Sequence, residues 1–221
     1  MNQKFLLISL LFFSIAASSI WLANYLGLIQ GAQLQPGNLN FINPQSTERT
    51  PQPNQFIDYD LEVFAQNLFV PWSIVFTSES RLLVSERSGS IRIIENGNLT
   101  IQPLYTFSQI STQVEEGLMG LALDPDYQTN KLLYACYAYP QQQNLFTKVV
   151  SLKDEGTQAN LQQTIIDQIP AAQFHAGCRI KFGPDQKLYI TTGDATNKNL
   201  AQDLDSLAGK ILRVNSDGSI P

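Results

Sequence analysis

The sequence predicts an all-β fold, specifically a β-propeller, from three observations. From about residue 57 onward, short runs rich in β-branched and aromatic residues alternate with turn residues, and helical periodicity is scarce. Asn96-Gly97 lies between two such runs, which is a strong hairpin signal. A unit of several runs also recurs, and repeats of roughly 40 to 50 residues with about four strands are typical of propeller blades. A β-sandwich with coincidental internal similarity is the alternative.

The expected strands follow one another along the folded part of the chain. They lie at 61–68, 72–76, 81–86, 90–95, 118–123, 131–139, 146–152, 163–169, 179–182, 188–192 and 210–215. The repeat unit begins near 74, 121 and 180, and the middle copy is the loosest. About three blades therefore fit, whereas a closed propeller has about four to eight. We expect the chain to be the first half of a longer propeller that has been truncated.

The first thirty residues have the pattern of an export signal. Residues 5–17 carry no charge, and a second apolar stretch follows at 20–29. Small residues near Ala17 suit a signal peptidase, whereas 5–29 together approach the length of a membrane-spanning helix. We expect residues 1–30 to be either a signal peptide or a hydrophobic helix that anchors the protein in a membrane. In both cases the protein is exported to the periplasm or cell envelope.

Composition defines the rest of the domain organisation. Residues 31–56 are rich in Gln, Asn, Pro, Ser and Thr, which predicts a disordered linker, and residues 57–221 form the propeller part. The chain of 221 residues is 43% hydrophobic, enough for one core. It has 14 Lys and Arg against 19 Asp and Glu, without a basic cluster. This balance excludes nucleic acid as an expected partner.

The two cysteines lie in apolar, strand-like runs. Export to an oxidising compartment permits a disulfide between Cys136 and Cys178, but two cysteines do not define a disulfide framework. We expect two small buried thiols, with the disulfide as the alternative.

His175 is the only histidine of the chain, and it stands beside a glycine and an arginine. Imidazole titrates near neutral pH, so such a residue is a candidate for proton transfer. On the residue pattern alone, a polar loop residue is the stronger interpretation. The segment 194–205 is rich in side-chain oxygens, but its spacing does not match the calcium-binding loop of EF-hands. We interpret it as a loop between strands.

Several motifs stand in a fixed order along the chain. They are PWSIVF (71–76), LVSER (83–87), EGLMGLALDPDY (116–127), HAGCR (175–179), GKILR (209–213) and GSIP (218–221). Together they resemble the successive motifs of the glucose/sorbosone dehydrogenase family. The members are soluble aldose dehydrogenases that use pyrroloquinoline quinone (PQQ) and fold as six-bladed propellers. The resemblance covers about residues 61–221 and implies that the family fold continues past the last motif.

The resemblance also implies roles for individual residues. His175 matches the general base that removes the proton from the C1 hydroxyl of an aldose while a hydride passes to the quinone, which yields a lactone. Arg179 matches a position near the mouth of the channel, where it pairs with a quinone carboxylate or, as an equal alternative, satisfies loop carbonyls. Glu115 and Glu116 match positions that contact the cofactor. Because two carboxylates repel an anionic quinone unless a cation intervenes, this acidic pair departs from the family pattern.

The remaining cofactor of the family is Ca²⁺, which holds and polarises the quinone. Its ligands in relatives correspond mainly to positions beyond residue 221, so we assign no metal ligand within this sequence. The expected substrate is an aldose, and the sequence does not identify the electron acceptor. We expect part of the site to lie outside this sequence. The chain is then either a dehydrogenase with a partial site or a non-catalytic propeller that serves as a binding scaffold in the cell envelope.

Overall fold

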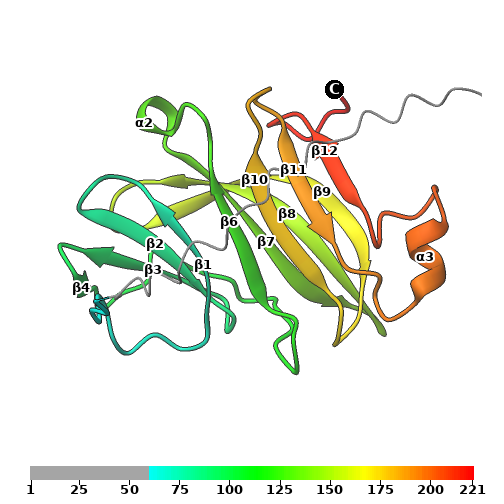
Figure 1. Ribbon diagram of the computed structural model, residues 1–221, viewed down its shortest axis with the longest axis horizontal. Coiled ribbons are helices and arrows are strands. Elements are labelled where there is room, and N and C mark those ends of the chain that lie inside the picture. Colours follow the sequence, from blue (N-terminus) through cyan, green and yellow to red (C-terminus); the bar gives the residue numbers. More distant parts are fainter. Residues whose placement is uncertain (1–59) are drawn as a thin grey trace, which may run out of the picture. The chain divides into compact units, whose positions relative to one another are not determined.

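The computed structural model describes residues 60–221. The signal or anchor predicted for 1–30 and the linker predicted for 31–56 lie outside the described residues. Within 60–221, three antiparallel sheets stand side by side as successive blades (Figure 1). The fold is all-β, as predicted. None of the helices in this part of the chain is long and apolar enough to cross a bilayer.

The first two sheets hold most of the strands. The first sheet has the order β1-β2-β3-β4, and β5 also pairs with β3. Its strands are β1 (Pro71–Phe76), β2 (Arg81–Glu86), β3 (Ser90–Glu95), β4 (Asn98–Leu99) and β5 (Tyr105–Thr106). The second sheet consists of β6 (Leu118–Leu123), β7 (Leu132–Gln141), β8 (Asn144–Asp154) and β9 (Ala159–Ala171). The second sheet and the first four strands of the first sheet are meanders, because strands that follow one another in the sequence pair with one another.

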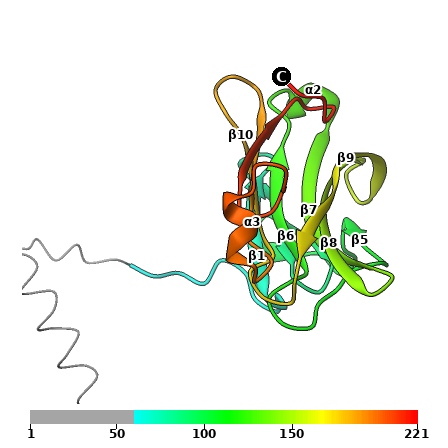
Figure 2. The ribbon, with the colours of Figure 1, turned by 90° about the vertical axis from the view of Figure 1, so that its right-hand side faces the viewer.

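The third sheet consists of β10 (Gly177–Phe182), β11 (Leu188–Thr192) and β12 (Ile211–Val214). Two short helices, α2 (Tyr127–Asn130) and α3 (Lys198–Gln202), connect β6 to β7 and β11 to β12. Figure 2 views the molecule from the side of the third sheet, where α3 faces the viewer. The segment predicted as a loop at 194–205 thus contains one short helix.

The turn chemistry agrees with the sequence at the β3–β4 hairpin. Asn96 and Gly97 have φ values of 50° and 76°, the left-handed conformation that a tight hairpin turn requires and that Asn and Gly adopt most readily. The predicted hairpin is confirmed. The short strand β4 pairs with the end of β3 through Leu99 and Asn98.

The strand predicted at 61–68 is wrong. These residues pair with no strand, and Leu61, Val63 and Phe64 are exposed. Ala65 and Leu68 instead pack on a small cluster formed by Leu82, Val84 and Ile94 on the outer face of the first sheet. The segment is apolar because it covers the face of a sheet, and apolar periodicity alone cannot distinguish this from pairing in a ladder.

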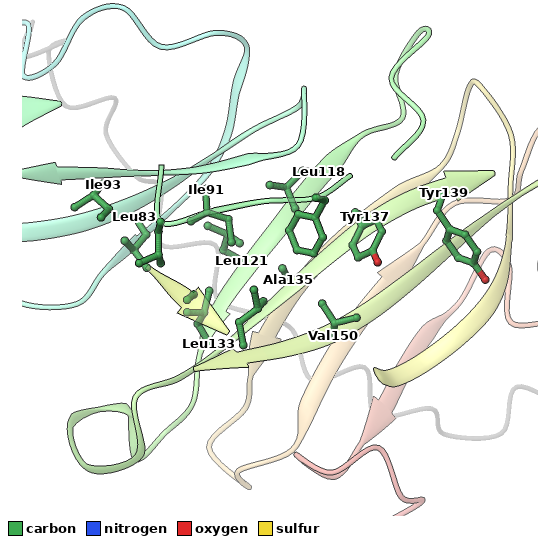
Figure 3. Packing of buried hydrophobic residues seen from close by; sticks show 14 residues of the cluster. Leu83, Ile91, Ile93, Leu118, Leu121, Leu133, Ala135, Tyr137, Tyr139 and Val150 are labelled. Atoms are coloured by element: carbon green, nitrogen blue, oxygen red, sulfur yellow. The ribbon is translucent and has the colours of Figure 1, made fainter. Parts of the chain in front are cut away.

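The middle sheet is buried on both faces, and this determines where the core lies. Leu133, Ala135 and Tyr137 of β7 face the first sheet, where they meet Leu83 and Ile91 (Figure 3). The alternate residues of β7 face the third sheet. They are Tyr134, Cys136 and Ala138. Because successive side chains of a strand point to opposite faces, burial of both faces explains the continuous apolar run of β7.

The second and third sheets approach closely at their inner strands. A Cβ atom on Gly120 of β6 would lie 2.8 Å from the carbonyl oxygen of Cys178 and 3.0 Å from the amide nitrogen of Ile180, both in β10. Only glycine fits between these backbones without displacing one of them. The contact places the first half of β10 directly against β6.

A disulfide joins these two sheets. Cys136 of β7 and Cys178 of β10 are fully buried, their Cα atoms are 6.3 Å apart, and their sulfur atoms are bonded. The prediction of two free thiols is therefore wrong. The sequence could not decide this point, because the pairing depends on which faces of two different sheets meet.

Candidate active site

His175 lies in the loop between β9 and β10, directly before the start of β10. Its side chain is 61% exposed and its backbone is left-handed, with φ of 56°. This conformation is uncommon for a residue with a side chain and requires support from its surroundings. The loop belongs to the end of the blades opposite α2, at the lower edge of Figure 1.

Asp194 supplies a partner for the imidazole that the sequence did not identify. The Nδ1 atom of His175 is 2.9 Å from Oδ1 of Asp194, which also accepts a hydrogen bond of 3.0 Å from the amide of Thr196. Hydrogen bonds from His175 and then from Thr196 hold the pKa of Asp194 below its ordinary value, against the opposing effect of partial burial. An ionised carboxylate at Nδ1 keeps a proton on that nitrogen and leaves Nε2 as an acceptor.

Two glycines allow the loops of His175 and Asp194 to approach each other. A Cβ atom on Gly193 would collide with the carbonyl oxygen of His175, and one on Gly177 would lie 2.7 Å from the amide nitrogen of Gly193. The amide of Ala195 donates a hydrogen bond of 3.3 Å to the carbonyl of His175. The β10–β11 pairing of Gly177 with Thr192 brings both loops to one end of the third sheet.

Glu115 holds the loop of His175 from the other side. Its Oε2 atom accepts a hydrogen bond of 2.9 Å from the backbone amide of His175, and its own amide donates one of 3.0 Å to the carbonyl of Gln173. The predicted site residues Glu115 and His175, 60 positions apart in the sequence, are therefore in direct contact.

Glu116 differs from its neighbour because it has no exposed surface. Burial disfavours its charge, but hydrogen bonds from the amides of Val114 and Gln113 and from the hydroxyl of Ser111 outweigh burial and lower its pKa. Its carboxylate is engaged by its own loop. Contact of Glu116 with a cofactor stays a prediction. In the structure its carboxylate accepts hydrogen bonds from three donors of its own loop.

Arg179 lies on β10 and is exposed. Its guanidinium carbon is 4.7 Å from the centre of the Trp72 ring on β1, a cation–π contact between the third and first sheets. Its amide donates to the hydroxyl of Thr191 at 3.1 Å. The Trp72 ring thus supports one face of the planar guanidinium, and Arg179 keeps exposed surface to which an anion can bind.

A cleft of about 510 Å³ lies elsewhere and is lined by residues of the first and second sheets. Arg81, Tyr127 and Asp154 line it and bind one another, with 2.7 Å between Arg81 Nη1 and Asp154 Oδ2 and 2.5 Å between Tyr127 Oη and Asp154 Oδ2. These polar groups satisfy one another's hydrogen-bonding capacity, and the Arg81–Asp154 pair links the first sheet to the second. None of the predicted site residues lines this cleft.

The acidic side chains of the described part do not form a metal-binding cluster. Across residues 60–221, the structure brings together no group of three or more His, Cys, Asp and Glu side chains that could hold a metal ion. Calcium requires about six to eight oxygen ligands. The described residues therefore supply no calcium-binding cluster, whereas the exposed guanidinium of Arg179 has the donors to bind a carboxylate.

Comparison with known proteins gives one consistent family. Residues 68–221 match the family described as Glucose / Sorbosone dehydrogenase. A Thermus thermophilus protein described as an oxidoreductase (glucose dehydrogenase) has a similar structure, with 38% identity and a TM-score of 0.67, over 72% of this chain and 48% of that one. The PQQ-bound aldose sugar dehydrogenase of Streptomyces coelicolor shares 34% identity with a TM-score of 0.63, over the same shares of the two chains.

A curated relative agrees with the structural neighbours. The aldose sugar dehydrogenase YliI of Escherichia coli K12 is 26% identical over 168 residues, which are 73% of this chain and 45% of that protein. This chain thus spans about half the length of the relatives it matches. Both the propeller fold and the family resemblance of the sequence are confirmed. The chain belongs to the glucose/sorbosone dehydrogenase family.

Proposed function

We propose that this chain carries the catalytic base of a PQQ-dependent dehydrogenase that oxidises the C1 hydroxyl of an aldose to a lactone. The observation that carries the proposal is the pairing of His175 Nδ1 with Asp194 at 2.9 Å, at an exposed end of the blades. The family match and the PQQ-bound relative support the choice of cofactor, and the aldose sugar dehydrogenases support the substrate class. Within residues 60–221, Nδ1 of His175 is paired and Nε2 has no hydrogen-bond partner, so Nε2 is available to a substrate hydroxyl.

His175 Nε2 accepts the proton of the C1 hydroxyl as a hydride leaves C1, and the C1–O bond becomes the carbonyl of the lactone. When bound, PQQ supplies the two-electron acceptor for that hydride. Asp194 keeps the proton on Nδ1 during this step and stabilises the imidazolium that forms. The same carboxylate restores the orientation of the ring once the proton has left for solvent.

Arg179 is the residue that would hold a carboxylate of PQQ, through the donors of its guanidinium. Its contact with Trp72 supports this role, because stacking fixes the plane of the guanidinium before the anion binds. Glu115 is close enough to His175 to touch a ligand there, and its negative charge favours a sugar hydroxyl over an anionic group. The described residues give no step to Ca²⁺, so none is assigned to it.

We also propose that the protein is exported. The buried disulfide supports this proposal, because structural disulfides form and persist in oxidising compartments such as the periplasm. Fractionation of cells that express the full chain tests it. Recovery from the cytoplasm with both cysteines reduced would exclude it.

The function is tested on the purified full chain with PQQ and Ca²⁺ added. Aldose-dependent reduction of a redox dye should appear in the wild-type protein and be lost in His175→Ala. Activity that survives His175→Ala would exclude the assigned base.

A non-catalytic binding scaffold is the second candidate function. The propeller fold by itself is compatible with it, because the same fold can serve as a binding module as well as an enzyme. Titration of PQQ against the folded protein separates the two functions. A change in quinone absorbance on binding supports the dehydrogenase, whereas no change in a protein that unfolds cooperatively supports the scaffold.

A further inference from the structure

The loop before β6, residues 111–117, is folded around one fully buried carboxylate. Glu116 Oε1 accepts hydrogen bonds from the hydroxyl of Ser111 at 2.9 Å and from the amide of Gln113 at 2.8 Å. Its Oε2 accepts one from the amide of Val114 at 2.9 Å. All three donors belong to the same loop. A buried carboxylate that satisfies three donors fixes the path of the backbone that carries them.

The loop is also attached to both neighbouring parts of the molecule. The side chain of Arg87, at the end of the first sheet, donates to the carbonyl of Val114, and the amide of Leu118 donates to the carbonyl of Arg87 at 3.0 Å. On the other side, the amide of Ser111 donates to the carbonyl of Ala138 in β7 at 3.0 Å. The loop therefore has a rigid base on the first and second sheets.

Glu115 extends from this base to His175. Its flanking residues in the loop are Val114, whose amide binds Glu116, and Glu116 itself. Through its amide and its carboxylate, Glu115 bonds to the backbone on both sides of Phe174, at Gln173 and at His175. The left-handed backbone of His175, with φ of 56°, is thus held by a residue whose own position depends on Glu116.

We propose that Glu116 is a positioning residue: its buried carboxylate folds the 111–117 loop into the shape in which Glu115 holds the backbone of His175. This inference rests on the proposed role of His175 as the base. Glu116 then touches neither substrate nor cofactor, and it acts through Glu115. The sequence alone suggested cofactor contact for both glutamates, and the proposal gives them different tasks.

Glu116→Gln is a sharp test because it changes one atom of the site. The Gln113 amide and the Ser111 hydroxyl share Oε1, so an amide side chain can satisfy both with its oxygen. The NH₂ group of the glutamine then takes the place of Oε2 and faces the amide N–H of Val114. Both groups are donors, so the hydrogen bond from Val114 is lost. Glu155→Gln is the matched control, because Glu155 is 43% exposed and lies near Lys153 in the second sheet.

The measurement uses the only histidine of the chain. In the ¹⁵N NMR spectrum of a protein without a histidine tag, the two ring nitrogens of His175 give signals that report the tautomer and its contact with Asp194. In Glu116→Gln these signals should shift away from the wild-type positions, whereas Glu155→Gln should leave them unchanged. In the protein loaded with PQQ and Ca²⁺, Glu116→Gln should lower kcat by about 10- to 100-fold, with a smaller change in KM.

Wild-type ring signals in a folded Glu116→Gln protein would overturn the proposal. If that variant does not fold, Ser111→Ala decides, because it removes one donor and keeps the two backbone bonds to Glu116. Ring signals displaced from their wild-type positions in Ser111→Ala support the proposal, and unchanged ring signals reject it. The spectra need neither cofactor nor turnover. A wild-type protein without dehydrogenase activity would therefore reject the proposed function while the positioning role is judged separately.

Discussion

Nδ1 of His175 lies 2.9 Å from Oδ1 of Asp194, although the two residues are 19 positions apart. Each stands at the end of a neighbouring strand, one just before β10 and the other just after β11. The antiparallel pairing of these strands places both residues at the same end of the third sheet. The contact therefore follows from the register of one strand pair, with Gly177 opposite Thr192.

Asp194→Asn should lower kcat of the loaded enzyme by about 100-fold or more, because a neutral amide no longer holds the proton on Nδ1 or stabilises the imidazolium. Steady-state kinetics with an aldose and a dye measure the effect. Asp205→Asn is the control, since Asp205 is an exposed carboxylate in the same connection between β11 and β12. Equal activity of both variants would argue against a role for the Asp194 contact.

Gly193→Ala should displace the His175 loop, because the added methyl group would collide with the carbonyl oxygen of His175. We expect a lower kcat together with a loss of roughly 1–3 kcal/mol of unfolding free energy, as is usual for overpacking. Gly156→Ala is the comparison, since a Cβ atom there meets nothing within 4 Å and adds only the cost of its left-handed backbone. If Gly193→Ala keeps full activity, the two loops do not need this close approach.

Loss of the disulfide should destabilise the protein by about 4 kcal/mol, the chain-entropy value for cysteines 42 residues apart. Thermal unfolding of Cys136→Ala/Cys178→Ala, or of the wild type with a thiol reductant, measures this. Thiol titration of the unreduced, denatured protein should detect no free thiol. Two titratable thiols per chain would show that the bond is absent.

Four buried tyrosines should resist ionisation in the folded protein. Burial, reinforced by Asp154, raises the pKa of Tyr127 to about 12, and burial together with Tyr105 and Asp167 does the same for Tyr137. The pKa values of Tyr134 and Tyr139 are raised further, again mainly by burial. A raised folded-state pKa stabilises the fold below the unfolded value, about 10, and this stabilisation is lost as the pH rises through the folded value.

The absorbance of phenolate measures this prediction. Of the eight tyrosines in the chain, four should have titration midpoints at about pH 12 or higher, or should ionise together with alkaline unfolding. In denaturant all should titrate near pH 10. A native titration that matches the denatured one would contradict the burial of these rings.

Some features of the site could be predicted because they are local. His175 is the only histidine of the chain and lies in a recognisable motif. Asn96 and Gly97 specify the β3–β4 turn because both residues readily adopt the left-handed conformation that it requires. Most strands could also be located, since alternation and β-branched residues act over a few positions. The segment 61–68 shows the limit of such patterns, because packing on a sheet and pairing in a sheet require the same apolar side chains.

By itself, the sequence determined the all-β fold, the positions of most strands, the family and the identity of the candidate base. Only the tertiary structure decided that Asp194 orients His175, that Glu116 is buried within its loop while Glu115 reaches the base, and that Cys136 meets Cys178. The physical reason is the range of the interactions. Strand and turn preferences depend on neighbouring residues, whereas each of these outcomes depends on the register between strands or on which faces of two sheets pack together.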